Sequence, residues 1–238
     1  MKKPLDLKNA VKFINEHGIL LVFPMANRPE PLSIWSCFFP KTRMLWEWDE
    51  TADGKVVQMW HLRERLSRSD RVVYSKWFSG RATFLSREVF VALLNGLHHG
   101  NPAFPQLSGR ARLLLDRLLE DSPQSSKTLK KWAKKECKWE EQEFERALKE
   151  LWARLLIVGR GEVDDGAFPS LNIGATQLMF EDLWQQAHGS DEKSHIVLER
   201  FLPPTSLWRK NFDRVKGTAR GSQSTPRKHV LYYHELIS

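Results

Sequence analysis

Apolar side chains recur along the first hundred residues at spacings that predict alternating helices and strands. Two β-rich runs flank Ser79-Gly80-Arg81, a short glycine-containing connection that favours a hairpin. Ser86 is expected to cap the helix that follows. In chain order, the predicted elements are a helix over Asp6–His17, a strand over Ile19–Phe23, a helix over Gly54–Ser69, strands over Val72–Phe78 and Ala82–Leu85, and a helix over Arg87–Leu97.

The pattern is clearest between residues 105 and 188, where three helices precede two strands. The third helix carries its large apolar side chains in one stripe over residues 144–155. This order is typical of a winged helix-turn-helix, with the glycine-rich strand pair as the wing. The predicted elements are helices over Ala111–Leu119, Lys127–Glu136 and Trp139–Leu155, a strand over Leu156–Val158, a loop over Gly159–Gly166 and a returning strand over Phe168–Ile173.

These patterns predict an α+β, mostly helical protein made of tandem winged helix-turn-helix units with small β-hairpin wings. We expect an N-terminal winged-helix-like domain over residues 1–104 and a second winged-helix domain over 105–188. Residues 189–238 are a basic C-terminal extension. Within it, residues 209–228 mix Lys and Arg with Gly, Ser and Pro, which favours a flexible tail or a loop ordered only on a partner. Val230–Ile237 is apolar enough to return as a terminal strand.

Composition narrows the class of partner. The formal net charge is +8, which favours polyanions but says nothing about fold. Only Cys37 and Cys137 occur, far apart, so we expect two reduced thiols and neither a disulfide framework nor a zinc site. No apolar run approaches the length of a membrane span, and the first residues lack the apolar segment of a signal peptide. We therefore expect a soluble cytoplasmic protein that does not bind membranes.

The strongest functional signal is a row of lysines on the second of the three helices. Their spacing places six ammonium groups on one face about 140° wide, opposite Leu129, Trp132 and Ala133. Like charges at this spacing repel, which is easier to explain if an anionic partner binds there. The alternative is a solvated face that serves solubility. The row comprises Lys127, Lys130, Lys131, Lys134, Lys135 and Lys138.

Further nucleic-acid contacts are predicted in three other places. On the third helix, Gln142 and Arg146 could read base edges, although its acidic first turn favours a protein contact instead. In the hairpin, basic residues alternate with Tyr74 and Trp77, which could stack on bases; the alternative is that these aromatics pack inward. The other predicted contacts are Arg71, Lys76 and Arg81 in the hairpin, and Arg209, Lys210, Arg214, Lys216 and Arg220 in the tail.

Catalytic signals are weak. The common nucleotide-binding, metalloprotease and nucleophile-elbow motifs do not occur. Glu47 and Asp49 alternate with tryptophans, and carboxylates among large aromatics can have raised pKa values. They are the least unlikely acid–base candidates; the alternative is aromatic packing with two acids facing solvent. We expect no metal and no cofactor.

Several phrases of the sequence resemble one family. The runs Trp60–Glu64 and Val72–Ser86, together with Phe144–Leu151 and Leu155–Gly159, look like the winged-helix DNA-binding proteins related to the AlkZ (YcaQ) crosslink-repair DNA glycosylases. The resemblance covers about residues 10–190. It implies tandem winged helices around a DNA-binding channel, and excision of alkylated bases without a metal.

The resemblance also implies a catalytic motif, Gln-x-Gln or Gln-x-Asp, that follows a glycine near the N-terminus. The matching stretch here is Gly18–Pro24, which contains neither Gln nor Asp. An apolar run cannot position a water molecule or stabilise positive charge on a sugar. No catalytic residue is therefore carried over from the family.

Three functions remain open from the sequence. The first is a non-catalytic or divergent relative of the repair glycosylases that binds duplex or damaged DNA. The second is an active, metal-independent glycosylase that removes alkylated bases. The third is a winged-helix scaffold that binds another protein.

Overall fold

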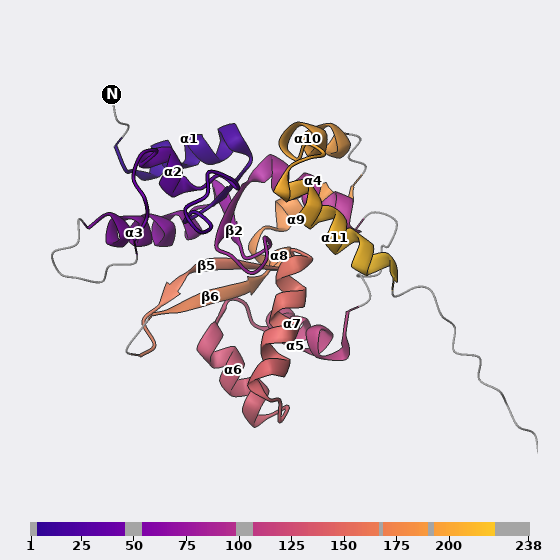
Figure 1. Ribbon diagram of the computed structural model, residues 1–238. Coiled ribbons are helices and arrows are strands. Elements are labelled where there is room, and N and C mark those ends of the chain that lie inside the picture. Colours follow the sequence, from indigo (N-terminus) through magenta and orange to yellow (C-terminus); the bar gives the residue numbers. More distant parts are fainter. Residues whose placement is uncertain (1–3, 46–53, 99–106, 167–168, 190–192, 222–238) are drawn as a thin grey trace, which may run out of the picture.

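The computed structural model describes residues 4–45, 54–98, 107–166, 169–189 and 193–221 (Figure 1). These residues form helices on both sides of one antiparallel sheet, so the expected mixture of helices and antiparallel strands is confirmed. Helices α5–α7 lie on one side of the strands, and the remaining helices lie on the other (Figure 1). None of the helices in these ranges is both long and apolar enough to cross a membrane.

The sheet has six strands in the order β1-β3-β2-β5-β6-β4. The hairpin β2–β3 joins the hairpin β5–β6 through one register pair, Tyr74 with Gly159. The two predicted hairpins therefore belong to one continuous sheet. The strands are β1 (Ile19–Leu21), β2 (Val72–Ser75), β3 (Thr83–Ser86), β4 (Gln124–Ser125), β5 (Ile157–Val163) and β6 (Ser170–Ala175).

Three helices cover the β1–β3–β2 end of the sheet: α1 (Leu7–His17), α2 (Ile34–Phe38) and α3 (Lys55–Ser67). The side chain of Asp6 accepts a hydrogen bond from the Asn9 backbone N–H at 2.8 Å and starts α1. Gly18 ends it with φ of 73°, a conformation that favours glycine. Apolar side chains of α1, α2 and α3 share one core cluster with β1 and β2.

A second group of helices surrounds α4 (Arg87–His98), which is buried on nearly all sides. Ser86 caps α4 as predicted. Around α4 pack α9 (Glu181–His188), α10 (Ser194–Phe201) and α11 (Leu207–Gly221), while α8 (Thr176–Met179) links β6 to α9. The expectation of a flexible tail from residue 209 is wrong as far as residue 221, because that segment is helical and buries Phe212 and Val215. Val230–Ile237 lies outside the described residues.

The other side of the sheet carries α5 (Gly109–Glu120), α6 (Ser126–Lys135) and α7 (Glu141–Ala153). The chain order is α5–β4–α6–α7–β5–β6, and β4 pairs with β6. Leu114, Leu129 and Leu151 are among the side chains that these helices bury in a shared core. The predicted loop Gly159–Gly166 is wrong in its first half, because β5 continues to Val163 past a register shift.

Candidate nucleic-acid interface

Helix α6 carries five of the six predicted lysines. Ser125 caps the helix, with its side chain accepting from the Thr128 backbone N–H at 3.0 Å. The helix ends at Lys135, and Lys138 follows it with a φ of 57°. The Lys138 ammonium donates to the Lys135 carbonyl at 2.8 Å. The prediction that six lysines share one helical face is therefore wrong for Lys138, although its ammonium still lies beside the helix end.

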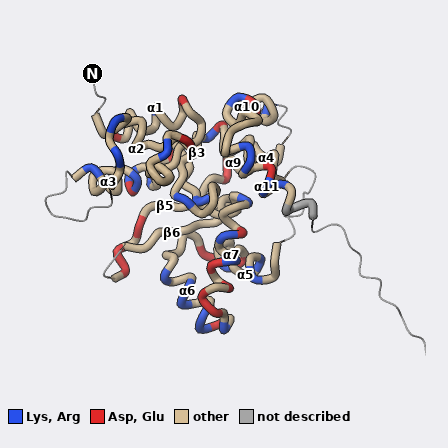
Figure 2. Tube along the Cα trace, viewed as in Figure 1, with Lys and Arg blue, Asp and Glu red and all other residues tan. Residues whose placement is uncertain are grey.

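Acidic neighbours occupy several of these lysines. Lys127 lies 3.0 Å from a carboxylate oxygen of Asp165, and Lys130 lies 2.6 Å from one of Glu141. The hydrogen bond and charge of Lys130 hold the pKa of Glu141 below its usual value. Figure 2 shows acidic residues of α7 and of the β5–β6 tip close to the blue lysines of α6. The face is therefore less positive than the sequence alone predicts.

Lys131 and Lys134 are the α6 lysines that form no ion pair among the described residues, although the charge of Lys134 also helps to lower the pKa of Glu141. Both lysines are exposed. Lys135 lies 3.6 Å from its neighbour Glu136. Lys130, Lys134 and Lys138 also line a shallow cavity of about 350 Å³ between α6 and the start of α7. Glu140 and Glu141 line the same cavity, so the exposed basic surface of α6 is centred on Lys131 and Lys134.

Asp165 lies in the loop between β5 and β6 and fixes this loop against the start of α6. Its Oδ2 accepts hydrogen bonds from the Ser125 and Ser170 hydroxyls, both at 2.7 Å. These two bonds, with the Lys127 ammonium, lower the pKa of Asp165 to about 2. Asp165 is therefore a structural carboxylate that ties three segments together.

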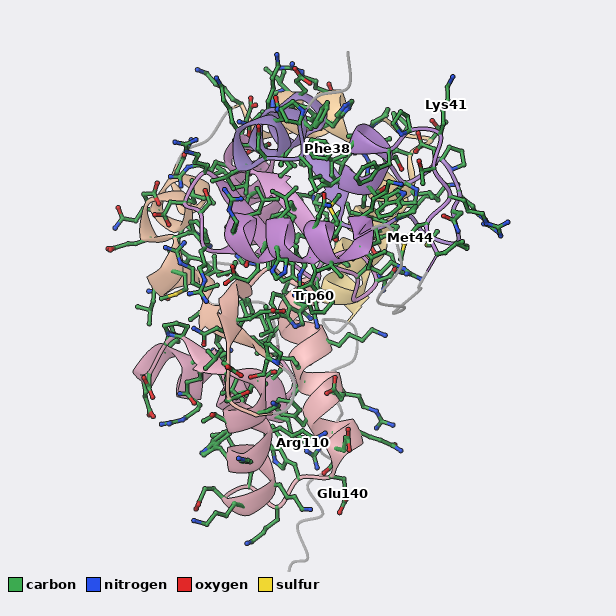
Figure 3. The ribbon with its side chains drawn as sticks, turned by 90° about the vertical axis from the view of Figure 1, so that its left-hand side faces the viewer. Phe38, Lys41, Met44, Trp60, Arg110 and Glu140 are labelled. Carbon is green, nitrogen blue, oxygen red and sulfur yellow. The ribbon has the colours of Figure 1, made fainter. Side chains whose placement is uncertain are left out.

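Helix α7 presents Gln142 and Arg146 to solvent. Its first turn is a capping box, in which Glu140 and Glu143 satisfy each other's backbone N–H groups. Glu143 also forms an ion pair with Arg110 of α5. Arg110 and Glu140 lie on the half of the molecule formed by α5–α7 (Figure 3). The acidic first turn therefore has a structural role.

The β2–β3 hairpin differs from its predicted role. Its register places Arg71 at one end and Lys76 and Arg81 at the other, so these three cations do not form one cluster. Tyr74 and Trp77 are buried, which contradicts stacking on bases and agrees with the inward-packing alternative. Burial lowers the pKa of Lys76, while the charge of Glu145 acts in the opposite direction.

The basic residues of α11 have mixed surroundings. Arg209 donates from Nε to the Leu202 carbonyl at 2.9 Å, and Arg214 donates to the Asn211 side chain at 2.8 Å. The Lys216 ammonium lies 5.5 Å from the centre of the Phe212 ring. Lys210 is exposed. The side chain of Arg220, and both Glu47 and Asp49, lie outside the described residues.

Within residues 18–24, where the resemblance led us to look for a catalytic motif, Ile19–Leu21 forms a strand at the edge of the sheet. Ile19, Leu20, Leu21 and Val22 are all buried. Leu21 pairs with Thr83 of β3, and the Val22 carbonyl accepts from the Trp35 backbone N–H at 3.1 Å. This stretch therefore supplies core packing and backbone pairing.

Sequence reasoning missed a buried ion pair between α3 and β5. Arg63 pairs with Glu162, and the side chains are 12% and 11% exposed. The Trp60 indole N–H donates to Glu162 at 3.2 Å, and the Arg63 guanidinium lies 3.9 Å from the Trp60 ring centre. Figure 3 shows Trp60 where the two halves of the molecule meet. The partners are about a hundred residues apart in sequence, so no local pattern reveals them.

Comparison with known proteins gives one match. Residues 5–198 match the family described as AlkZ related. The match spans most of the chain and includes every strand of the sheet. Searches of curated proteins and of solved structures found no match. Because the family match covers well over half of the sequence, this chain belongs to the AlkZ related family.

Proposed function

We propose that this protein binds duplex or damaged DNA and is a non-catalytic or divergent relative of the DNA-repair glycosylases. Membership of the AlkZ related family supports a role of the repair-glycosylase type. The single structural observation that carries DNA binding is the exposed surface of α6, where Lys131 and Lys134 form no ion pair among the described residues. Each phosphate that such lysines neutralise releases counterions, so binding should weaken steeply with salt.

The proposal includes a winged-helix domain over residues 105–188, preceded by a related unit over 1–104. In its support, the order α5–β4–α6–α7–β5–β6 and the pairing of β4 with β6 match a winged helix-turn-helix. The β5–β6 hairpin is then the wing. Its acidic tip and the acidic first turn of α7 favour contact through α6 over deep insertion of α7 into the major groove.

The absence of glycosylase catalysis is part of the proposal. It is supported by burial of the apolar strand Ile19–Leu21, which lies where we expect the family's catalytic motif from the resemblance. A buried apolar strand offers no group that could orient an attacking water.

The test is fluorescence anisotropy of the full chain with a labelled duplex at several salt concentrations. We expect micromolar or tighter binding at low salt. The variant K131E/K134E should weaken binding at least tenfold and reduce the slope against log salt by about two units. The variant K8E/K12E, on α1 at the far end of the molecule, makes the same change in net charge and is the matched control (Figure 1).

Three outcomes would contradict the proposal. Duplex binding that is absent or insensitive to salt at low ionic strength would exclude the DNA-binding role. Base release from N7-alkylated DNA, measured in the same samples, would instead support the active-glycosylase alternative. A partner recovered equally well before and after nuclease treatment would favour the protein scaffold.

A further inference from the structure

A groove near the N-terminus has a composition that the functional argument above does not use. It encloses about 670 Å³ between the loop after β1 and the segment after α2. Its walls contain three basic side chains and several aromatic or proline side chains. We call this cavity the N-terminal groove. Its lining includes Arg28, Trp35, Phe39, Pro40, Lys41 and Arg43.

The charge of the N-terminal groove has one sign. Arg28, Lys41 and Arg43 are all exposed, and Lys41 projects outward from this end of the molecule (Figure 3). None of the three forms an ion pair within the ranges that the structure describes, and no described acidic side chain lines the groove. Three cations around one concave surface create a local positive potential that attracts an anion.

The groove is held in shape by hydrogen bonds between its two segments. The Asn27 side-chain amide donates to the Met44 carbonyl at 2.9 Å, and its oxygen accepts from the Met44 backbone N–H at 2.7 Å. The Trp35 indole N–H donates to the Thr42 carbonyl at 3.0 Å. These bonds hold the two segments beside each other, so Arg28 and Arg43 extend from neighbouring positions of the backbone.

Aromatic groups give the groove an apolar floor. Phe39 is half-buried, and its ring centre lies 4.9 Å from that of Trp35. A phenyl ring beside cations suits a ligand that alternates phosphate groups with flat bases. Double-stranded DNA keeps its bases stacked inside the duplex, so a ring in this position can reach only an unpaired base.

We propose that the N-terminal groove binds an unpaired strand of nucleic acid, with phosphates on Arg28, Lys41 and Arg43 and a base against Phe39. This inference rests on the proposed function and adds a second subsite, separate from the α6 surface. It assigns duplex binding to α6 and strand binding to the groove. The molecule would then bind DNA at places where the two strands have separated.

The experiment compares two probes on the full chain: a blunt duplex and a labelled oligothymidine of about ten nucleotides. The groove variant K41E/R43E and the α6 variant K131E/K134E make the same change in net charge, so each controls for the other. We expect K41E/R43E to weaken oligothymidine binding at least tenfold and duplex binding by less than about threefold. The α6 variant should weaken duplex binding more than oligothymidine binding.

A second variant tests stacking separately from charge. Phe39→Leu preserves an apolar side chain but removes the aromatic face, and should weaken oligothymidine binding about fivefold or more. Circular dichroism and thermal midpoints will verify that each variant is folded. Polyglutamate of matched charge is added as a competitor.

The outcomes separate the two proposals. Unchanged oligothymidine binding by both K41E/R43E and Phe39→Leu would overturn the groove assignment even if the duplex binds. Equal competition by polyglutamate, with no effect of Phe39→Leu, would assign the groove to acidic peptides instead. Oligothymidine binding that needs the groove, without any duplex binding, would support the groove and exclude the α6 duplex surface.

Discussion

At the scale of single residues, the Arg63–Glu162 pair carries a prediction about stability. Both side chains are nearly buried, and Trp60 contacts both. Removing one partner leaves a buried charge without its counterion, so Arg63→Met should lower the free energy of unfolding by about 3 kcal/mol. The double variant R63M/E162M should recover most of this loss, since it removes both charges.

Urea unfolding of the single and double variants forms a double-mutant cycle. Strongly non-additive losses are expected. The structure indicates that the two charges are coupled. Losses of stability that simply add in the double variant would contradict this coupling.

A buried histidine at the end of α4 predicts a dependence on pH. His98 Nε2 lies 2.9 Å from the Arg154 carbonyl and donates to it, so its Nδ1 faces His188 Nε2 at 3.2 Å as an acceptor. Burial lowers the pKa of His98 to about 4, and the charges of His188 and Arg154 act in the same direction. Folding therefore favours the neutral ring.

Because the folded pKa lies below the unfolded value near 6.5, this stabilisation is complete above that value and is lost as pH falls towards 4. The loss is on the order of 3 kcal/mol at most. Urea unfolding at several pH values should show that the free energy of unfolding falls more steeply with decreasing pH in the wild type than in His98→Phe. Parallel curves for the two proteins would show that His98 is not responsible.

At the scale of elements, Asp165 should control the order of the β5–β6 hairpin. Asp165→Ala removes the acceptor shared by Ser125, Ser170 and Lys127, so amide hydrogen exchange in β5 and β6 should accelerate. Because the pKa of Asp165 is lowered to about 2, its carboxylate stays charged as the pH falls below the usual carboxyl pKa. The stability that it contributes is complete above that usual pKa and is lost as the pH falls through about 2. The adjacent, exposed Asp164→Ala is the matched control and should leave exchange unchanged. Equal acceleration in both variants would contradict a specific role for Asp165.

Element prediction succeeded where spacing and caps agreed. Helices α1, α4 and α6 begin at Asp6, Ser86 and Ser125, whose side chains satisfy backbone N–H groups, and their apolar positions repeat at helical spacing. Helix α2 was missed because its five residues, which lie between Pro31 and Pro40, are too few to show a helical repeat of apolar side chains. In α11, Trp208, Phe212 and Val215 do have helical spacing, but the surrounding Lys, Arg and Gly residues suggested disorder.

The candidate site was only partly predictable for a different reason. Local spacing placed the α6 lysines on one side of a helix, and the structure agrees for the five that α6 contains. Their partners Glu141 and Asp165 come from other elements, so the sequence could not show that Lys127 and Lys130 are paired. The N-terminal groove was missed because Arg28, Lys41 and Arg43 lie in two loops that long-range contacts bring together.

At the scale of the whole molecule, the two halves share one sheet, and Leu155 and Val158 also pack with the side chains of α4 in one core cluster. Tyr74 and Gly159 form the register pair between β2 and β5, and Arg68 of α3 donates to the Glu162 carbonyl at 2.8 Å. The Tyr74 ring fills the space above Gly159 and lies 5.2 Å from Phe84. Glycine at this position therefore permits the sheet to continue from one half to the other.

Adding one methyl group at this junction should weaken the β2–β5 pairing. A Cβ on Gly159 would overlap Tyr74 Cδ1, and the Tyr74 side chain is buried. Gly159→Ala should therefore lower the free energy of unfolding by about 1–3 kcal/mol and speed hydrogen exchange in β2 and β5. Gly109→Ala is the matched control, because a Cβ there meets open space at the start of α5. Replacing Tyr74 by Leu should be less harmful in the Gly159→Ala background than in the wild type, since the smaller side chain relieves the clash. If Gly159→Ala is as stable as Gly109→Ala, the β2–β5 pairing does not hold the two halves together.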